Sequence, residues 1–223
     1  MKLGIIGATE GEINPLINQI HNLTITKHAL QTFMDGSIGD VKVVVVLCGV
    51  GKFNATIATQ MVIDIFHVTH IVNIGVAGAI DETLHICDTI VSSQVTYHDV
   101  ADDVLITYQS YLKGVYLHAD AKMLYEIIEA NFDDPSIYVG KIVSGEGAIT
   151  ELGRNEIKNK YHPLCVDMET ASIAHVCYVN AIPFVAIRSI SHMLESEGDV
   201  FGKDYQKASE KSVNITLQFI NSK

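Results

Sequence analysis

Basic side chains are scarce in this sequence, and their scarcity limits the partners that the protein can have. Its 223 residues include 15 lysines and arginines against 26 aspartates and glutamates, which gives a formal net charge of -11. A chain this acidic is repelled by phosphate backbones and by anionic membrane surfaces. We therefore expect neither nucleic acid nor a membrane as a partner.

Long hydrophobic segments are missing as well. No stretch of the sequence reaches the roughly 18 consecutive apolar residues of a membrane span. The N-terminal sequence MKLGIIGATEGE contains an apolar run that is too short for the core of a signal peptide. We expect a cytoplasmic protein.

The four cysteines lie far from one another in the sequence. Cys48, Cys87, Cys165 and Cys177 form no CxxC or CxxH pair, so the sequence contains no zinc framework and no sign of a disulfide scaffold. Each has apolar neighbours, and small buried side chains are the simpler interpretation. The acidic segment 98–103 also contains one histidine and three aspartates, but local hydrogen bonding is a more common use of such a loop than metal binding.

Apolar runs and helical spacings alternate along the chain, and hydrophobic residues make up 48% of it. Strands are predicted at 2–7, 42–48, 70–76, 88–95, 137–144, 163–166 and 183–190, and helices at 52–66, 119–131, 168–179 and 202–220. This alternation predicts an α/β fold in a single domain, residues 1–223. The segment 97–118 is long for a connection, and we expect a lid or an interface there.

Two glycine turns follow predicted strands. The turn at 49–52 opens a helix, but Phe53 stands where a P-loop needs serine or threonine, and Asn54 stands where a dinucleotide fingerprint needs its third glycine. The second turn covers residues 73–78. Such turns bring the backbone close either to a small ligand or to a packed neighbour, and both interpretations remain open.

Carboxylates follow two of the predicted strands. Glu12 lies just after the first strand, where an acidic residue can either complement a helix dipole or do chemistry. Asp167 can cap the apolar helix that follows it. Glu169 has no such capping role, and a carboxylate there could accept two hydrogen bonds from a vicinal diol such as ribose. Ser191 and His192 follow the last strand, but no nucleophilic triad accompanies them.

Several segments, taken in order, resemble the 5′-methylthioadenosine/S-adenosylhomocysteine nucleosidases of the nucleoside phosphorylase family. They are GIIGATEGEI (4–13), CGVGKFNA (48–55), VNIGVAGAI (72–80), YHD (97–99), IVSGEGAI (142–149) and VDMETASIAHVCYVNAIPFVAIRSIS (166–191). The resemblance implies a three-layer α/β/α domain around a mixed, partly barrel-like sheet. It also implies a homodimer that binds a purine nucleoside, hydrolyses the N-glycosidic bond of adenine thioribosides, and uses no metal or organic cofactor.

The resemblance assigns catalytic roles to four residues. Glu12 matches the carboxylate that activates water, and its presence favours hydrolysis over phosphorolysis. Arg188 matches the arginine beside that water, and Ser191 the serine that orients the catalytic acid. His192 stands at the position of that acid.

The remaining assignments concern substrate binding. Glu169 matches the carboxylate that holds the ribose hydroxyls, Met168 packs under the sugar, and Asp167 is placed with them. The base is expected beside Ile149. The other predicted contacts, in the sugar, thioether and base regions, are Ala8, Val50, Val76 and Ala148.

The sequence departs from the family pattern at three positions. His192 replaces an aspartate that protonates the purine, Val76 replaces a hydroxyl-bearing residue, and Ala148 replaces an aromatic residue that stacks on the base. Imidazole, with a pKa near 6.5, can donate a proton in place of a carboxyl group. Two alternatives therefore stand beside the nucleosidase: a hydrolase or phosphorylase of another nucleoside, and a nucleoside-binding protein without turnover.

Overall fold

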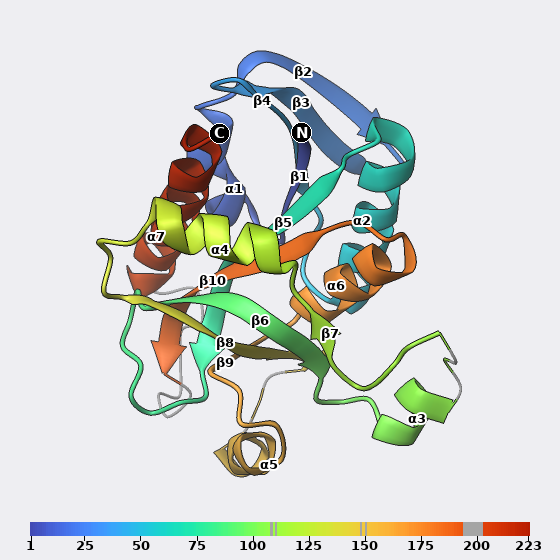
Figure 1. Ribbon diagram of the computed structural model, residues 1–223, viewed down its shortest axis with the longest axis vertical. Coiled ribbons are helices and arrows are strands. Elements are labelled where there is room, and N and C mark those ends of the chain that lie inside the picture. The colour runs from blue at the N-terminus through green and yellow to red at the C-terminus, as the bar shows by residue number, and fades with distance from the viewer. Residues whose placement is uncertain (108, 110, 148, 150, 194–202) are drawn as a thin grey trace.

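The strands of the computed structural model join into one mixed sheet (Figure 1). The structure describes residues 1–107, 109, 111–147, 149, 151–193 and 203–223. Within them the strands are β1 (Lys2–Gly7), β2 (His21–His28), β3 (Gln31–Ile38), β4 (Val41–Leu47), β5 (His70–Ala79), β6 (Thr89–Tyr97), β7 (Leu117–His118), β8 (Ile137–Ser144), β9 (Cys165–Asp167) and β10 (Phe184–Met193).

Part of the sheet closes on itself. Strand β10 pairs with both β5 and β6, and β9 pairs with both β8 and β5, so β5, β10, β6, β8 and β9 form a ring. From β5 the sheet continues as an open wing through β1, β4, β3 and β2. Strand β5 is parallel to β1 and β10, so the carboxyl ends of these three strands lie at the same edge. The expected mixed, partly barrel-like sheet is confirmed.

Helices cover the sheet on two sides (Figure 1). The helices are α1 (Glu10–Ile17), α2 (Lys52–Phe66), α3 (Asp102–Thr107), α4 (Ala121–Ala130), α5 (Glu151–Tyr161), α6 (Thr170–Val179) and α7 (Lys203–Asn221). One layer contains α1, α4 and α7, and the opposite layer contains α2 and α6. The three-layer α/β/α architecture is therefore confirmed.

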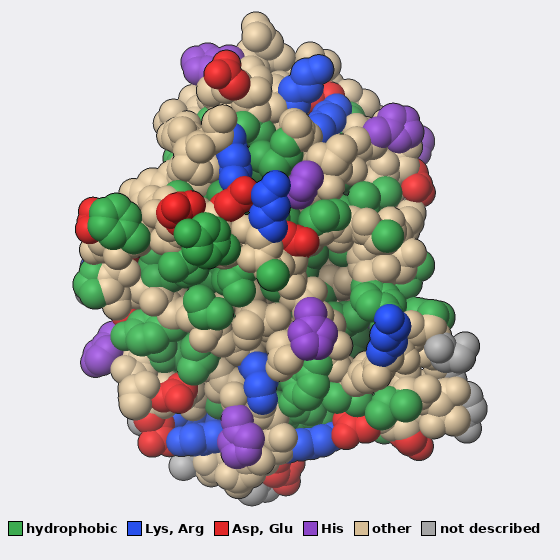
Figure 2. Space-filling view, viewed as in Figure 1, with side chains coloured by type: hydrophobic (Ala, Val, Ile, Leu, Met, Phe, Trp, Pro, Cys, Tyr) green, Lys and Arg blue, Asp and Glu red, His purple; other side chains and the backbone are tan. Residues whose placement is uncertain are grey.

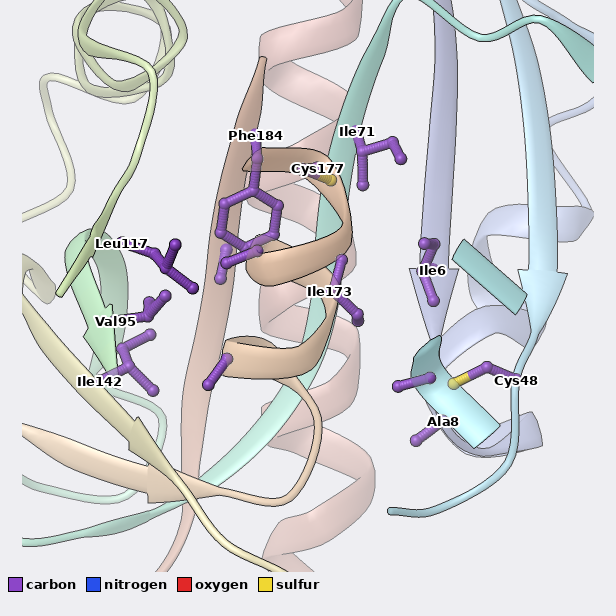
Figure 3. Close-up of a cluster of buried hydrophobic side chains, with 14 of the residues drawn as sticks. Ile6, Ala8, Cys48, Ile71, Val95, Leu117, Ile142, Ile173, Cys177 and Phe184 are labelled. Atoms are coloured by element: carbon purple, nitrogen blue, oxygen red, sulfur yellow. The ribbon is translucent and has the colours of Figure 1, made fainter. Parts of the chain in front are cut away.

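Two hydrophobic clusters fill the spaces between these layers. Along β1, Leu3 and Ile5 face the layer of α1, α4 and α7, whereas Ile6 faces α2 and α6. This alternation is the pattern of a strand that is covered on both faces. In the cluster that contains Ile6, Ile173 and Cys177 of α6 pack toward the strands, beside Phe184 at the start of β10 (Figure 3).

The long connection expected at 97–118 contains structure of its own, namely α3 and β7. Acidic residues of this segment pair with lysines: Asp99 with Lys52, and Asp102 with Lys160. None of the described helices is long and apolar enough to cross a membrane. On the face shown in Figure 2, lysines and arginines are scattered among acidic residues and histidines and form no continuous basic band.

Candidate active site

Side chains from distant segments meet at the carboxyl ends of β1, β5 and β10. Glu12 comes from the first turn of α1, directly after β1, and Arg188 lies in β10. Glu169 lies between β9 and α6, and Gly51 immediately precedes α2. This edge is where open α/β sheets bind their ligands. The structure brings together the three residues to which the resemblance gave the central roles: Glu12, Glu169 and Arg188.

The carboxylate of Glu12 is held by three backbone N–H groups. Its Oε2 accepts hydrogen bonds from Ala8 N at 2.8 Å and Thr9 N at 3.0 Å, and its Oε1 accepts one from Val76 N at 3.0 Å. The side chain is 2% exposed. A carboxylate fixed in this way has one orientation, which general base catalysis requires.

Arg188 is held by neutral groups on its inner side. Nε donates to Thr170 Oγ1 at 3.1 Å, and Nη2 donates to Asn73 Oδ1 at 2.8 Å. Nη1 lies 3.4 Å from the carbonyl oxygen of Val76, to which it donates. With 1% of its surface exposed, the guanidinium depends on these protein partners in place of water.

Three carboxylates surround the same guanidinium. Nη2 lies 2.7 Å from Asp167 Oδ2 and 3.2 Å from Glu169 Oε2, and Nη1 lies 3.7 Å from Glu12 Oε1. Burial opposes the positive charge, but the carboxylates, Asp167 foremost, outweigh burial and raise the pKa of Arg188 above its ordinary value. Arg188 therefore stays charged and links the carboxylates into one cluster.

Asp167 is engaged by protein donors on both oxygens. Ser144 Oγ donates to Oδ1, and Thr170 donates through its hydroxyl to Oδ2 and through its backbone N, which lies 3.3 and 3.2 Å from the two oxygens. Asp167 thus accepts from the backbone N–H of Thr170, the first residue of α6, and it also pairs with Arg188; the N-cap position itself is occupied by Glu169, two residues later than predicted. The helix begins at Thr170 rather than at Met168.

Glu169 connects the arginine to the first glycine turn. Its Oε1 accepts a hydrogen bond from Gly51 N at 2.8 Å, and its Oε2 accepts one from Arg188 Nη2 at 3.2 Å. Burial raises the pKa of Glu169 to about 7; Arg188 opposes this shift and Asp167 adds to it. Each oxygen keeps a further lone pair, so the two oxygens together can accept hydrogen bonds from a diol.

The second glycine turn allows two charged groups to approach the backbone. Gly75 has φ +150°, and a Cβ there would lie 2.3 Å from both Arg188 Nη1 and Glu12 Oε1. No side chain fits at such distances. The second turn therefore brings the backbone close to packed side chains of the site, and a ligand beside the turn stays a prediction.

Comparison with known proteins shows the family to which the chain belongs. The model of the phosphorylase superfamily matches residues 2–221. The chain belongs to the phosphorylase superfamily. Among curated members of that superfamily, a 5′-methylthioadenosine/S-adenosylhomocysteine nucleosidase of Exiguobacterium is 34% identical, over 97% of this chain and 96% of the relative.

Solved structures of the superfamily are similar over nearly the whole chain. The nucleosidase of Colwellia psychrerythraea, in complex with adenine, is 32% identical with a TM-score of 0.88, over 99% of this chain and 95% of that one. The nucleosidase of Neisseria meningitidis, in complex with methylthio-immucillin-A, is 26% identical with a TM-score of 0.90, over 100% and 99% of the two chains.

Ser191 and His192 lie within β10, which extends to Met193, and not after the strand as the sequence predicted. Ser191 Oγ and His192 Nδ1 lie 3.0 Å apart. Ser191 is buried and His192 is half-buried. Burial lowers the pKa of His192 below its ordinary value, so the imidazole is neutral at pH 7. If the hydroxyl donates to Nδ1, the ring carries its proton on Nε2 and can donate it to a ligand.

The other predicted substrate contacts differ in exposure. Ala8 is buried, Met168 and Val76 are partly buried, and Val50 is 43% exposed beside the start of α2. Ile149 lines a cavity of about 400 Å³ next to α5. Their contacts with a substrate stay predictions, and Ala148 lies outside the described residues.

Sequence reasoning missed the residues that hold the catalytic groups. Asn73 Oδ1 accepts from Arg188 and lies 2.8 Å from Thr170 Oγ1, and its own Nδ2 donates to the carbonyl of Ile6 at 2.9 Å. The available signal was a polar residue inside the apolar strand run HIVNIGV. Such a residue is buried with its hydrogen bonds satisfied, and it was a candidate for a structural role at the site.

Proposed function

We propose that the protein hydrolyses the N-glycosidic bond of 5′-methylthioadenosine/S-adenosylhomocysteine-type nucleosides and releases adenine and a thioribose. The observation that carries the proposal is the buried carboxylate of Glu12, fixed by three backbone N–H groups beside Arg188 and Glu169. The names and bound ligands of the relatives agree with it. The proposal includes a role in methionine salvage, because the thioribose retains the sulfur substituent. It also includes a cytoplasmic location.

The chemistry follows from the charges of the site. Glu12 accepts a proton from a water molecule that attacks the anomeric carbon of the ribose, while Glu169 accepts hydrogen bonds from the ribose hydroxyls. The transition state of such a reaction carries positive charge on the sugar, and the two carboxylates stabilise that charge electrostatically. Arg188 holds both carboxylates in place. The proposed steps involve these side chains, water and the nucleoside, and they require no metal or organic cofactor.

His192 is proposed to assist departure of the purine. With Nδ1 engaged by Ser191, the neutral imidazole can donate a hydrogen bond from Nε2–H to the purine N7 as negative charge develops on the base, and the departing adenine takes its proton from solvent water. Loss of one hydrogen-bond donor to a developing anion costs about 10²–10³-fold in rate. We expect His192→Ala to lower kcat by a factor in about this range, measured as adenine release at pH 7. A kcat equal to that of the wild type would remove His192 from the mechanism.

The test of the function is release of adenine by the purified protein. We expect release from 5′-methylthioadenosine or S-adenosylhomocysteine between pH 5 and 8, at the same rate with and without phosphate. No release from any adenine thioriboside would contradict the proposal. Release that requires phosphate, or that occurs only from another nucleoside, would favour the alternative that Val76 and His192 suggest: a phosphorylase or hydrolase of different specificity.

A homodimer is the second part of the proposal. Helix α2 carries an exposed apolar stripe at four-residue spacing, Phe53, Ile57 and Ile65, with the partly buried Met61 between them. Tyr178 and Val179 of the neighbouring α6 are also exposed. A contiguous apolar surface of this kind favours association. The stripe starts beside Val50, so a second copy docked there would lie next to the predicted thioether region.

A further inference from the structure

Helix α2 begins without a cap from its own residues. Gly51 at the N-cap position has no side chain, and the first turn contains no acidic residue. The first N–H groups of a helix lack partners within the helix, and its N-terminus carries partial positive charge. At a 15-residue helix next to the active site, these groups need partners from elsewhere in the chain.

Two carboxylates from distant segments supply the missing cap. Gly51 N donates to Glu169 Oε1 at 2.8 Å, and the next N–H, of Lys52, donates to Glu146 Oε2 at 3.0 Å. Gly51 has φ +98°, and a Cβ on it would lie 2.6 Å from Glu146 Oε1. The glycine therefore permits the close approach of Glu146. The backbone of Gly51 and Lys52 is thus held by two carboxylates: that of Glu169, which is proposed to bind ribose, and that of Glu146.

A ring of interactions fixes Glu146 in turn. Its backbone N donates to Asp99 Oδ2 at 2.8 Å, and both oxygens of Asp99 accept from Lys52 Nζ, at 2.8 and 2.7 Å. The ring therefore joins the start of α2 to the segments that follow β6 and β8. The segment after β8 continues to Ile149, beside which the base is expected. The side chains of Lys52 and Asp99 are 18% and 28% exposed, so solvent screens their ion pair only in part.

We propose that Glu146 is a positioning residue for ribose binding, acting through the N-terminus of α2 on Glu169. It holds the Gly51 N–H at the place where that group orients one oxygen of Glu169, and it ties this turn to the segment expected to bind the base. The inference rests on the proposed function, because it assigns Glu169 to the ribose hydroxyls. Glu146 itself does not touch the substrate.

The expected size of the effect follows from the strength of helix caps. Removing an N-cap acceptor changes an equilibrium by about 2- to 30-fold. We expect Glu146→Ala to raise KM for 5′-methylthioadenosine by about tenfold, with a smaller fall in kcat. Glu146→Gln keeps an acceptor oxygen and should fall between the alanine variant and the wild type. Glu129→Ala, which removes an exposed carboxylate from α4, is the matched control and should leave KM unchanged.

A double-mutant cycle separates positioning from a merely structural role. If Glu146 acts through Glu169, then Glu146→Ala introduced into Glu169→Gln should change KM by less than about twofold. The same tenfold penalty in both backgrounds would overturn the inference. So would a loss of thermal stability in Glu146→Ala with an unchanged KM. Thermal unfolding of every variant shows whether it is folded.

The outcome also distinguishes this inference from the proposed function. A wild type that releases adenine while Glu146→Ala behaves like Glu129→Ala overturns the inference alone. A wild type that releases none overturns the function. Calorimetric binding of 5′-methylthioadenosine to the same variants then tests the inference, which survives only if Glu146→Ala weakens binding through Glu169. A wild type that neither binds nor turns over the nucleoside overturns both.

Discussion

Arg188 faces three carboxylates, which differ in the other hydrogen bonds that they accept. Glu12 has three backbone N–H donors besides the arginine, and Asp167 has Ser144 and Thr170. Glu169 has the single N–H of Gly51. Hydrogen-bond donors stabilise the ionised form of a carboxylate, and Glu169 has one backbone donor of this kind. Burial raises the pKa of Glu169 to about 7, and Arg188 and the N–H of Gly51 offset this shift only in part.

That pKa predicts the pH dependence of substrate binding. Below pH 7 the protonated Glu169 loses acceptor capacity, and above pH 7 the carboxylate is available to both ribose hydroxyls. If only the ionised form binds, KM should fall by about tenfold from pH 6 to pH 8. Initial rates of adenine release over this range measure it, and Glu169→Gln should abolish the dependence. A KM that stays flat in the wild type, or that varies equally in the variant, would contradict this role.

The sequence was sufficient to predict the site residues that lie in short motifs. It was insufficient to predict the residues that hold those side chains in place. Glu12, Glu169 and Arg188 were assigned from short segments, and the structure brings them together. Glu146 could not be found in this way, because its partner Lys52 is 94 positions away. Hydrogen bonds over such separations leave no local pattern in a sequence. The proposed roles of Met168, Val50 and Ile149 depend on a bound nucleoside and remain predictions.

At the scale of elements, strands that are buried on both faces were predictable from their apolar runs, whereas an exposed hairpin was not. β1 is such a strand and lies where the sequence predicted it; β8, which is partly exposed in its first half, also matches its predicted range. Strands β2 and β3 were missed: every residue of β2, HNLTITKH, is exposed, and β3, QTFMDGSI, is partly buried but also lacks a long apolar run. Helix α2 matches its predicted range, 52–66, and its spacing also carries the apolar stripe on its outer face.

The apolar stripe on α2 predicts that one charged substitution within it prevents formation of the homodimer. Phe53 is 75% exposed, and a glutamate there would bury an unpaired charge in the proposed interface. We expect Phe53→Glu to sediment as a monomer while the wild type sediments as a dimer, and KM to rise because the thioether region loses its neighbouring subunit. Tyr125→Glu, at a residue 65% exposed on α4 in the opposite layer, is the control and should remain a dimer.

Either of two results would refute the assembly proposal. One is a wild type that is monomeric at assay concentrations. The other is a Phe53→Glu variant that is folded and still dimeric. Ile57→Glu, four residues further along the same stripe, tests the same surface if Phe53→Glu does not fold.

At the scale of the whole molecule, the site is a product of the closed part of the sheet. Strands β5 and β10 run parallel inside the ring and, together with β1, deliver Gly75, Arg188 and Glu12 to one edge. The chain segments involved extend from the first strand to the last, so a fragment that lacks either β1 or β10 lacks part of the site. The fold class followed from the sequence because strand and helix patterns alternate. The closure of the ring followed only from the resemblance, because pairing partners are not encoded in periodicity.

The most direct measurement is the rate of adenine release from 5′-methylthioadenosine, without phosphate at pH 7, by wild type and Glu12→Gln. Glu10→Gln serves as a control, because it changes an exposed glutamate in the same first turn of α1. If Glu12 is the general base, Glu12→Gln should be slower by about 10²–10⁴-fold while Glu10→Gln equals the wild type. A Glu12→Gln variant that releases adenine as fast as the wild type would contradict the account.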